Sequence, residues 1–124
     1  MRPMKILVVD DEPTNAEILS LLLTREGHQV TIASDGPSGV EAALRLNPDM
    51  VFMDVLMPGD FDGLEAIRRI KADPAFTGIV ICQSARASGA DQEEGLVSGA
   101  DGYLTKPFKR RDVLELIAQF EPGL

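Results

Sequence analysis

Apolar residues gather in short runs along this chain of 124 residues, and each run ends in polar residues. The runs at 6–9, 50–53 and 79–82 contain no polar residue, which is typical of strands buried on both faces. At 29–32 polar and apolar residues alternate instead, as in a half-exposed strand at the edge of a sheet. With a short candidate at 101–104, the pattern predicts five strands.

Between the predicted strands, apolar positions recur at helical spacing, and helices are expected at 13–26, 35–47, 62–73, 89–98 and 109–120. Ser38 with Glu41, and Asp62 with Glu65, have the spacing of a capping box, and Pro122-Gly123 is expected to end the last helix. The side chains expected to face the core are Ile18, Leu19, Leu22, Leu23, Val40, Ala43, Leu44, Leu64, Ile67, Ile70, Ala90, Leu96, Val97, Val113, Leu116, Ile117 and Phe120.

Strict alternation of strands and helices predicts an α/β fold: a doubly wound parallel sheet with right-handed crossovers and helices on both faces. The three fully apolar strands belong in the centre and the second strand at an edge, which the order 2-1-3-4-5 satisfies. The chain shows no repeat, linker or low-complexity stretch, so one domain over residues 1–124 is expected.

Composition narrows the functional classes. The net charge is −8, which disfavours direct nucleic-acid binding because such a surface repels phosphate backbones. No apolar run reaches the length of about 18 residues that a membrane span needs. Cys82 is the single cysteine, so no disulfide can form within the chain, and a cytoplasmic location fits best. His28, the single histidine, is expected at the surface.

Three carboxylates follow the first and third strands. Asp10, Asp11 and Asp54 come to the same edge of a parallel sheet, where open α/β folds place their sites. Carboxylates this close repel one another unless protons or a cation intervene, and their hard oxygens suit Mg²⁺. Asp10 and Asp11 could instead favour the positive N-terminus of the first helix, but that role leaves Asp54 unexplained.

The fourth and fifth strands end in a hydroxyl, Ser84, and an amine, Lys106. Each is weak evidence alone, since serine is common in turns and lysine is common in solvent. Together with the carboxylates they form a set suited to phosphoryl transfer onto an aspartate: a nucleophile, a metal site, a hydroxyl donor and a cation.

With these residues in place, the sequence resembles the response-regulator receiver domains of two-component signalling over nearly its whole length. The separations of 30 residues from Asp54 to Ser84 and 22 from Ser84 to Lys106 match that family. The matching motifs are Asp10-Asp11, Asp54 with Met57-Pro58, Asp62-Gly63, Ser84-Ala85 and Lys106-Pro107. The strand order 2-1-3-4-5 is itself the established order of flavodoxin and the chemotaxis response regulator.

The resemblance implies that Asp54 accepts a phosphoryl group from a histidine kinase or histidine phosphotransfer protein. It implies Mg²⁺ held by Asp11, Asp54 and the Leu56 backbone carbonyl, and by Asp10 through water. Ser84 and Lys106 would contact the phosphoryl group. The domain would catalyse only its own phosphotransfer and dephosphorylation.

The resemblance also implies a switch and a cis Lys106-Pro107 peptide bond. Ser84 would move toward the phosphoryl group and Tyr103 would turn inward, which changes the surface of the fourth helix, fifth strand and fifth helix. A downstream protein or an output domain would read that surface.

One departure from the family pattern follows Pro58, where Gly59, Asp60 and Phe61 precede Asp62, one residue more than usual. The departure leaves open how this loop is held and whether Asp60 adds charge to the site.

Three other functions remain to be weighed. A Mg²⁺-dependent phosphatase of the dehalogenase type would need an Asp two residues after Asp54, where Leu56 stands. A carrier of FMN would need a phosphate-binding loop where the chain has Asp10 and Asp11. A pseudo-receiver that docks without being phosphorylated would not need the complete set of site residues.

Overall fold

The computed structural model describes residues 3–86 and 88–120, and Pro122-Gly123 lies outside this part. Within it no helix is long and apolar enough to cross a membrane. Strands and helices alternate through the described residues, with bounds close to those predicted. They are β1 (Lys5–Val9), α1 (Pro13–Arg25), β2 (Gln29–Ala33), α2 (Gly36–Leu46), β3 (Met50–Asp54), α3 (Gly63–Ala72), β4 (Ile79–Ser84), α4 (Gly89–Ser98), β5 (Gly102–Thr105) and α5 (Arg110–Phe120).

The strands form one parallel sheet in the order β2-β1-β3-β4-β5, which confirms the predicted fold class. The central strand β3 is buried at all its positions, whereas the edge strand β2 is exposed at Gln29, Thr31 and Ile32. Central strands are covered on both faces and therefore read as continuous apolar runs, which is why the order could be predicted.

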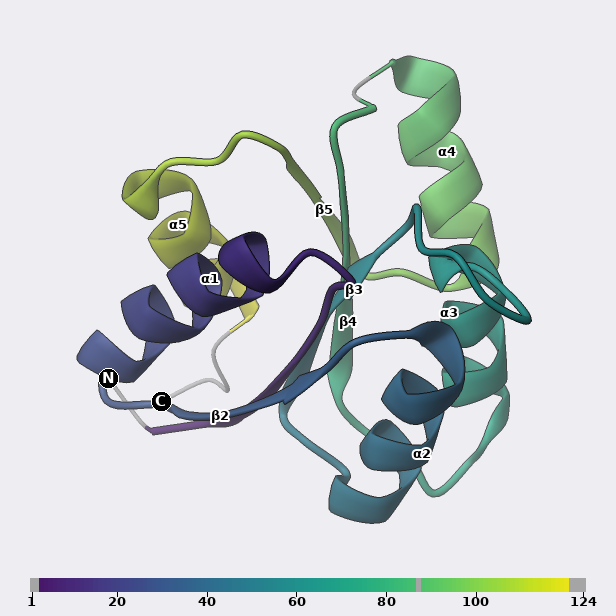
Figure 1. The fold of residues 1–124 in the computed structure, drawn as a ribbon, viewed down its shortest axis with the longest axis horizontal. Helices are drawn as coiled ribbons and strands as arrows, with labels where there is room; N and C mark the ends of the chain where they lie inside the picture. The colour runs from purple at the N-terminus through teal and green to yellow at the C-terminus, as the bar shows by residue number, and fades with distance from the viewer. Residues whose placement is uncertain (1–2, 87, 121–124) are drawn as a thin grey trace.

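Helices α1 and α5 cover one face of the sheet, and α2, α3 and α4 cover the other, as Figure 1 shows. Each layer has its own apolar core. Residues Leu19 and Leu23 of α1 meet Val113 and Ile117 of α5 beneath one face. Beneath the other face the core comprises Leu7, Val9, Ala42, Ala43, Val51, Met53, Val55, Met57, Leu64, Ala66, Ile67, Ile70, Val80, Cys82 and Ala100.

Several apolar residues expected to face the core point to solvent instead. In α1, Ala16, Leu19 and Leu23 are buried, and Ile18, about 100° around the helix from Leu19, is 53% exposed. Leu44 of α2 is also exposed.

Helix α4 shows the largest departure from the predicted pattern. Its buried residues are Gly95 and Ser98, while Leu96 and Val97 are 54% and 79% exposed. A Cβ on Gly95 would lie 3.2 Å from Cys82 Sγ and 3.3 Å from the Tyr103 ring, so a small residue lets this helix approach β4 and β5 closely. Hydrophobicity predicted the wrong face because the packing here selects for small size.

Aspartates cap the starts of α2 and α3. Asp62 caps α3 by accepting a hydrogen bond from the Glu65 backbone N–H at 3.0 Å, as the sequence predicted. The predicted capping box between Ser38 and Glu41 in α2 is wrong: the cap is Asp35, which accepts from the Ser38 backbone N–H at 2.7 Å. The helix begins at Gly36, two residues before Ser38, so the serine sits inside its first turn.

His28 is not the surface residue that the sequence suggested. It is 4% exposed, and its Nδ1 accepts a hydrogen bond from the Met4 backbone N–H at 3.0 Å. The parallel pairing of β1 with β2 brings residue 28 beside the start of β1, which buries the ring.

Candidate functional site

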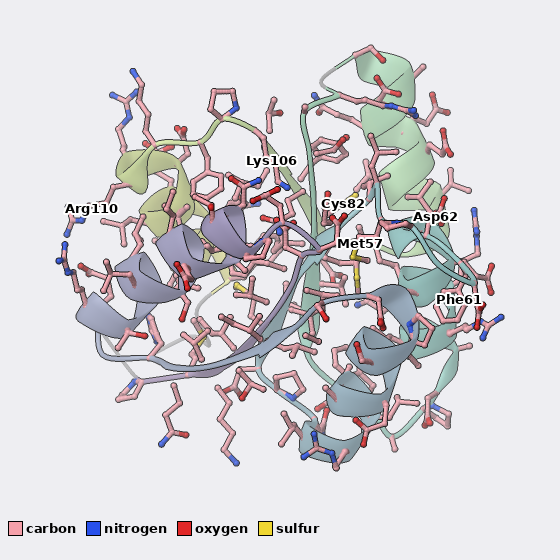
Figure 2. All side chains as sticks on the ribbon, in the orientation of Figure 1. Met57, Phe61, Asp62, Cys82, Lys106 and Arg110 are labelled. Atoms are coloured by element: carbon pink, nitrogen blue, oxygen red, sulfur yellow. The ribbon has the colours of Figure 1, made fainter. Side chains whose placement is uncertain are left out.

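Polar side chains from three parallel strands meet where those strands end. Asp10 directly follows β1, Asp54 is the last residue of β3, and Lys106 directly follows β5. Parallel strands end at one edge of the sheet, so residues up to 96 positions apart in the sequence come into contact there. Figure 2 shows Lys106 over the middle of the sheet, between the two helical layers.

Asp10, Asp11 and Asp54 form an acidic cluster. Each offers a carboxylate oxygen, and these three oxygens lie within 4.8 Å of one another. Asp10 and Asp54 are 2% and 5% exposed, whereas Asp11 is open to solvent. Hard oxygen donors with one side open to water fit Mg²⁺, which uses one or two carboxylates and keeps several waters.

Lys106 joins the two buried carboxylates. Its Nζ lies 2.9 Å from Asp10 Oδ2 and 3.4 Å from Asp54 Oδ1, and its side chain is 16% exposed. Asp10 also accepts a hydrogen bond on Oδ1 from the Glu12 backbone N–H at 2.9 Å. One ammonium faces three carboxylates in the described site, so the cluster keeps an excess of negative charge that favours a cation.

The carboxyl group of Asp54 is the most strongly perturbed acid of the cluster. Its pKa is raised from 3.8 to about 7: burial is the largest cause, Lys106 lowers the pKa, and the negative charge of Asp10 raises it. A cation in the cluster would favour the ionised form and so reverse this shift.

The backbone around Asp54 is held on two sides. The Val55 N–H donates to the Gln83 carbonyl at 3.0 Å, and the Gly63 N–H donates to the Val55 carbonyl at 3.0 Å. Gly63, the first residue of α3, packs so closely that a Cβ there would overlap the carbonyl oxygen of Asp54. The start of α3 therefore fixes the end of β3.

Ser84 and Tyr103 both form hydrogen bonds with the backbone of Arg86. The Ser84 hydroxyl accepts from the Arg86 backbone N–H at 3.0 Å, and the Tyr103 hydroxyl donates to the Arg86 carbonyl at 2.7 Å. Ser84 is buried at the end of β4, and Tyr103 on β5 is half-buried. A displacement of one of these side chains would therefore move the backbone of Arg86 and, through it, the other side chain.

The remaining predicted residues lie around this group. The Lys106–Pro107 peptide bond is cis, and the Lys106 N–H donates to the Ser84 carbonyl at 2.8 Å. The Leu56 side chain is 49% exposed, and its backbone belongs to the loop that leaves β3 beside Asp54.

The lengthened loop after Pro58 is held by Phe61. Its ring lies 4.0 Å from the guanidinium carbon of Arg69 and packs over Gly36, where a Cβ would be 3.0 Å from the ring. Figure 2 shows Phe61 on the right, next to α2 and α3 and away from Lys106. Gly59 adopts a φ of +121°, and Asp60 is exposed in a hollow with Asp35, outside the acidic cluster. The extra residue thus adds no charge to the cluster.

Gln83 belongs to the site but was not predicted. It is 1% exposed, lies in register with Asp54, and its Nε2 is 3.5 Å from Asp10 Oδ2. The available signal was a polar residue that follows the apolar run 79–82 and precedes Ser84.

Comparisons with known proteins all point to the same family. The model of the response regulator receiver domain matches residues 6–118. The probable transcriptional regulatory protein TcrX of Mycobacterium tuberculosis is 38% identical over 113 residues, which cover 91% of this chain and 47% of TcrX. The DNA-binding response regulator MtrA of Mycolicibacterium smegmatis is 36% identical over 110 residues, covering 89% of this chain and 47% of MtrA. The chain spans about half the length of these relatives.

Solved structures agree. The receiver domain of sensor histidine kinase PA1611 from Pseudomonas aeruginosa, with a magnesium ion coordinated in its active site cleft, superposes with a TM-score of 0.87 at 32% identity, covering 96% of this chain and 98% of that one. Chemotaxis protein CheY4 of Vibrio cholerae superposes with a TM-score of 0.88 at 26% identity, covering 96% of this chain and 99% of that one. The chain therefore belongs to the response regulator receiver domains of two-component signalling.

Proposed function

We propose that Asp54 is the phosphoacceptor of this receiver domain. The observation that carries the proposal is the contact of Lys106 with both buried carboxylates, because it puts a cation and a metal-binding cluster beside one potential nucleophile. Asp11, Asp54 and the Leu56 carbonyl would hold Mg²⁺ directly, and Asp10 would hold it through water.

The chemistry is transfer of a phosphoryl group between partners. A carboxylate oxygen of Asp54 forms a bond to phosphorus while the bond from phosphorus to the imidazole nitrogen of a phosphohistidine breaks, and the imidazole leaves neutral. Lys106 neutralises the transferred oxygens and Ser84 donates a hydrogen bond to one of them. Bound Mg²⁺ would supply further positive charge for the same oxygens. The signal ends when a water oxygen bonds to the phosphorus and the bond from phosphorus to the Asp54 oxygen breaks. Asp54 leaves as a carboxylate, and inorganic phosphate and a proton are released.

The partners follow from this chemistry. The donor is a histidine kinase or a histidine phosphotransfer protein. We propose that the domain lies with it in the cytoplasm, where ATP is the phosphoryl source for such kinases. The readout is the surface of α4, β5 and α5. The exposed apolar side chains Leu96 and Val97, and the link from Ser84 through Arg86 to Tyr103, support a protein partner there.

The experiment is incubation with radiolabelled acetyl phosphate and Mg²⁺. We expect the wild type and Asp60→Asn to take up label that is stable in acid and lost in base. Asp54→Asn and chelator-treated protein should take up none. Asp60 is a matched control because it is an exposed acid of the same loop outside the cluster. Label that persists in Asp54→Asn would refute the assignment. Turnover of many phosphate esters would favour the phosphatase instead, as free FMN binding would favour the carrier.

A further inference from the structure

Gln83 brings a neutral amide into the buried part of the site. Its backbone is fixed, because its carbonyl accepts from the Val55 N–H at 3.0 Å and its Cα pairs with Asp54 in the sheet. Its side chain is 1% exposed and reaches Asp10, which follows β1, two strands away in the sheet. An amide this deeply buried is costly unless both of its polar atoms are satisfied.

Two donors share one oxygen of Asp10. Lys106 Nζ lies 2.9 Å from Oδ2 and is the stronger partner, whereas Gln83 Nε2 lies 3.5 Å from the same atom, at the outer limit of a hydrogen bond. Lys106 also lies 3.4 Å from Asp54 Oδ1, so its ammonium already divides its charge between two acids.

The other amide atom of Gln83 leaves the side chain room to adjust. Within residues 3–86 and 88–120, no donor lies within hydrogen-bond distance of the buried Oε1. Within this part of the chain, no hydrogen bond to Oε1 therefore opposes a small shift of Nε2 toward Asp10. The backbone anchor and the unheld side chain together make Gln83 a donor that can tighten its contact.

We propose that Gln83 is a positioning residue for the cation site, whose amide takes over Oδ2 of Asp10 when Lys106 turns toward the phosphoryl group. This inference rests on the proposed phosphorylation of Asp54. A buried carboxylate that loses its strongest donor is destabilised unless another donor replaces it. Gln83 keeps Asp10 in place at the moment when the cluster must hold a cation and a phosphoryl group together.

The test compares the wild type with Gln83→Met, which keeps the length of the side chain and removes its donor. Calorimetric titrations measure binding of Mg²⁺ alone, and of beryllium fluoride in the presence of Mg²⁺ as a stable substitute for the phosphoryl group. We expect Gln83→Met to weaken beryllium fluoride binding about fivefold, the effect of one hydrogen bond, and Mg²⁺ binding by less than about twofold. Mg²⁺ alone leaves Lys106 on Asp10, so the amide matters less there.

Cys82→Ala is the matched control. Cys82 precedes Gln83 on the same strand, and its side chain packs in the core beneath α2, α3 and α4. It should leave both affinities unchanged. Unchanged beryllium fluoride affinity in Gln83→Met would overturn the inference. An equal loss of affinity for Mg²⁺ and for beryllium fluoride would also overturn it, because it would indicate a merely structural role. A wild type that binds Mg²⁺ but not beryllium fluoride would overturn the proposed function itself, and the inference with it.

A second measurement needs no variant and decides the matter if Gln83→Met does not fold. In the wild type, the side-chain amide protons of Gln83 should move downfield in the NMR spectrum when beryllium fluoride is added to the Mg²⁺-loaded protein, because a shorter hydrogen bond deshields them. Resonances that do not move would overturn the inference.

Discussion

Asp54 shows how the surroundings of a single residue set its chemistry. Burial, with the neighbouring charge of Asp10, raises its pKa to about 7 even though Lys106 lies 3.4 Å away. The metal-free carboxyl group is therefore partly protonated near neutral pH, whereas a metal ligand or a nucleophile must be ionised. Proton and cation compete for the same oxygens.

The first prediction concerns pH. Asp54 is mostly protonated below pH 7 and mostly ionised above it, so apparent Mg²⁺ affinity should rise as the pH rises through about 7. Between about pH 6 and about pH 8 we expect a gain of roughly tenfold, measured by calorimetry. In Asp54→Asn this dependence should disappear. A wild-type affinity that does not change across this range would contradict the raised pKa.

At the residue scale, the sequence predicted that Asp10, Asp54 and Lys106 would meet, and it missed Gln83. Asp10 and Lys106 directly follow strands and Asp54 is the last residue of one. A parallel sheet gathers strand ends at one edge, so topology alone brings these residues together. Gln83 could be assigned only once its side chain was seen to reach Asp10 at 3.5 Å. His28 was misjudged for a similar reason, since its burial depends on the pairing of β1 with β2.

At the scale of elements, the N-terminus of α3 holds the acceptor strand in place. Gly63 lets the helix begin directly against the carbonyl of Asp54, and the Asp62 cap fixes where it begins. The helix and strand are thus joined by backbone packing that no larger residue would allow.

The second prediction tests that joint. Gly63→Ala should lower the free energy of unfolding by about 1–3 kcal/mol, because the new Cβ overlaps the Asp54 carbonyl and the helix must shift. Gly89→Ala is the matched control: it is also the first residue of a helix, but its Cβ would meet open space. Denaturant unfolding measures both. Equal effects of the two substitutions would show that the close contact is not what matters.

The third prediction concerns the lengthened loop. Phe61→Ala removes the packing over Gly36 and the contact with Arg69, so amide hydrogen exchange in residues 55–61 should become faster. Arg69→Leu should have a smaller effect in the same direction, worth about 0.5–1 kcal/mol.

Arg68→Leu is the control for that substitution. Arg68 and Arg69 both pair with Glu65, at 3.2 and 3.0 Å, but the described cation–π contact with Phe61 belongs to Arg69. Loop exchange in Phe61→Ala equal to that of the wild type would show that something other than this ring holds the loop.

The buried face of a helix could be predicted where the buried residues are the hydrophobic ones. It could not be predicted where small residues are buried instead. The period of α3 pointed to Leu64, Ile67 and Ile70, all buried. In α4 the same reasoning chose Leu96 and Val97, because sequence patterns score apolarity while this helix packs through glycine and serine.

At the scale of the whole molecule, the sheet order turns separate strand ends into one site. The order followed from two facts in the sequence, strict alternation and the contrast between fully apolar and alternating strands. What the sequence could not supply was the loop conformation after Pro58, since an inserted residue can be absorbed in several ways. In the structure, Gly59 and Phe61 hold the loop away from the acidic cluster, which consists of Asp10, Asp11 and Asp54 and does not include Asp60.

The central claim is that one buried aspartate at the end of β3 accepts the phosphoryl group. The most direct measurement treats the protein with acetyl phosphate and Mg²⁺, reduces it with borohydride, and maps the modified residue by mass spectrometry. Borohydride converts an aspartyl phosphate to homoserine and leaves a free carboxylate unchanged. We predict homoserine at position 54 and unmodified aspartate at 10, 11 and 60. Homoserine at one of those other positions, with Asp54 intact, would contradict the account.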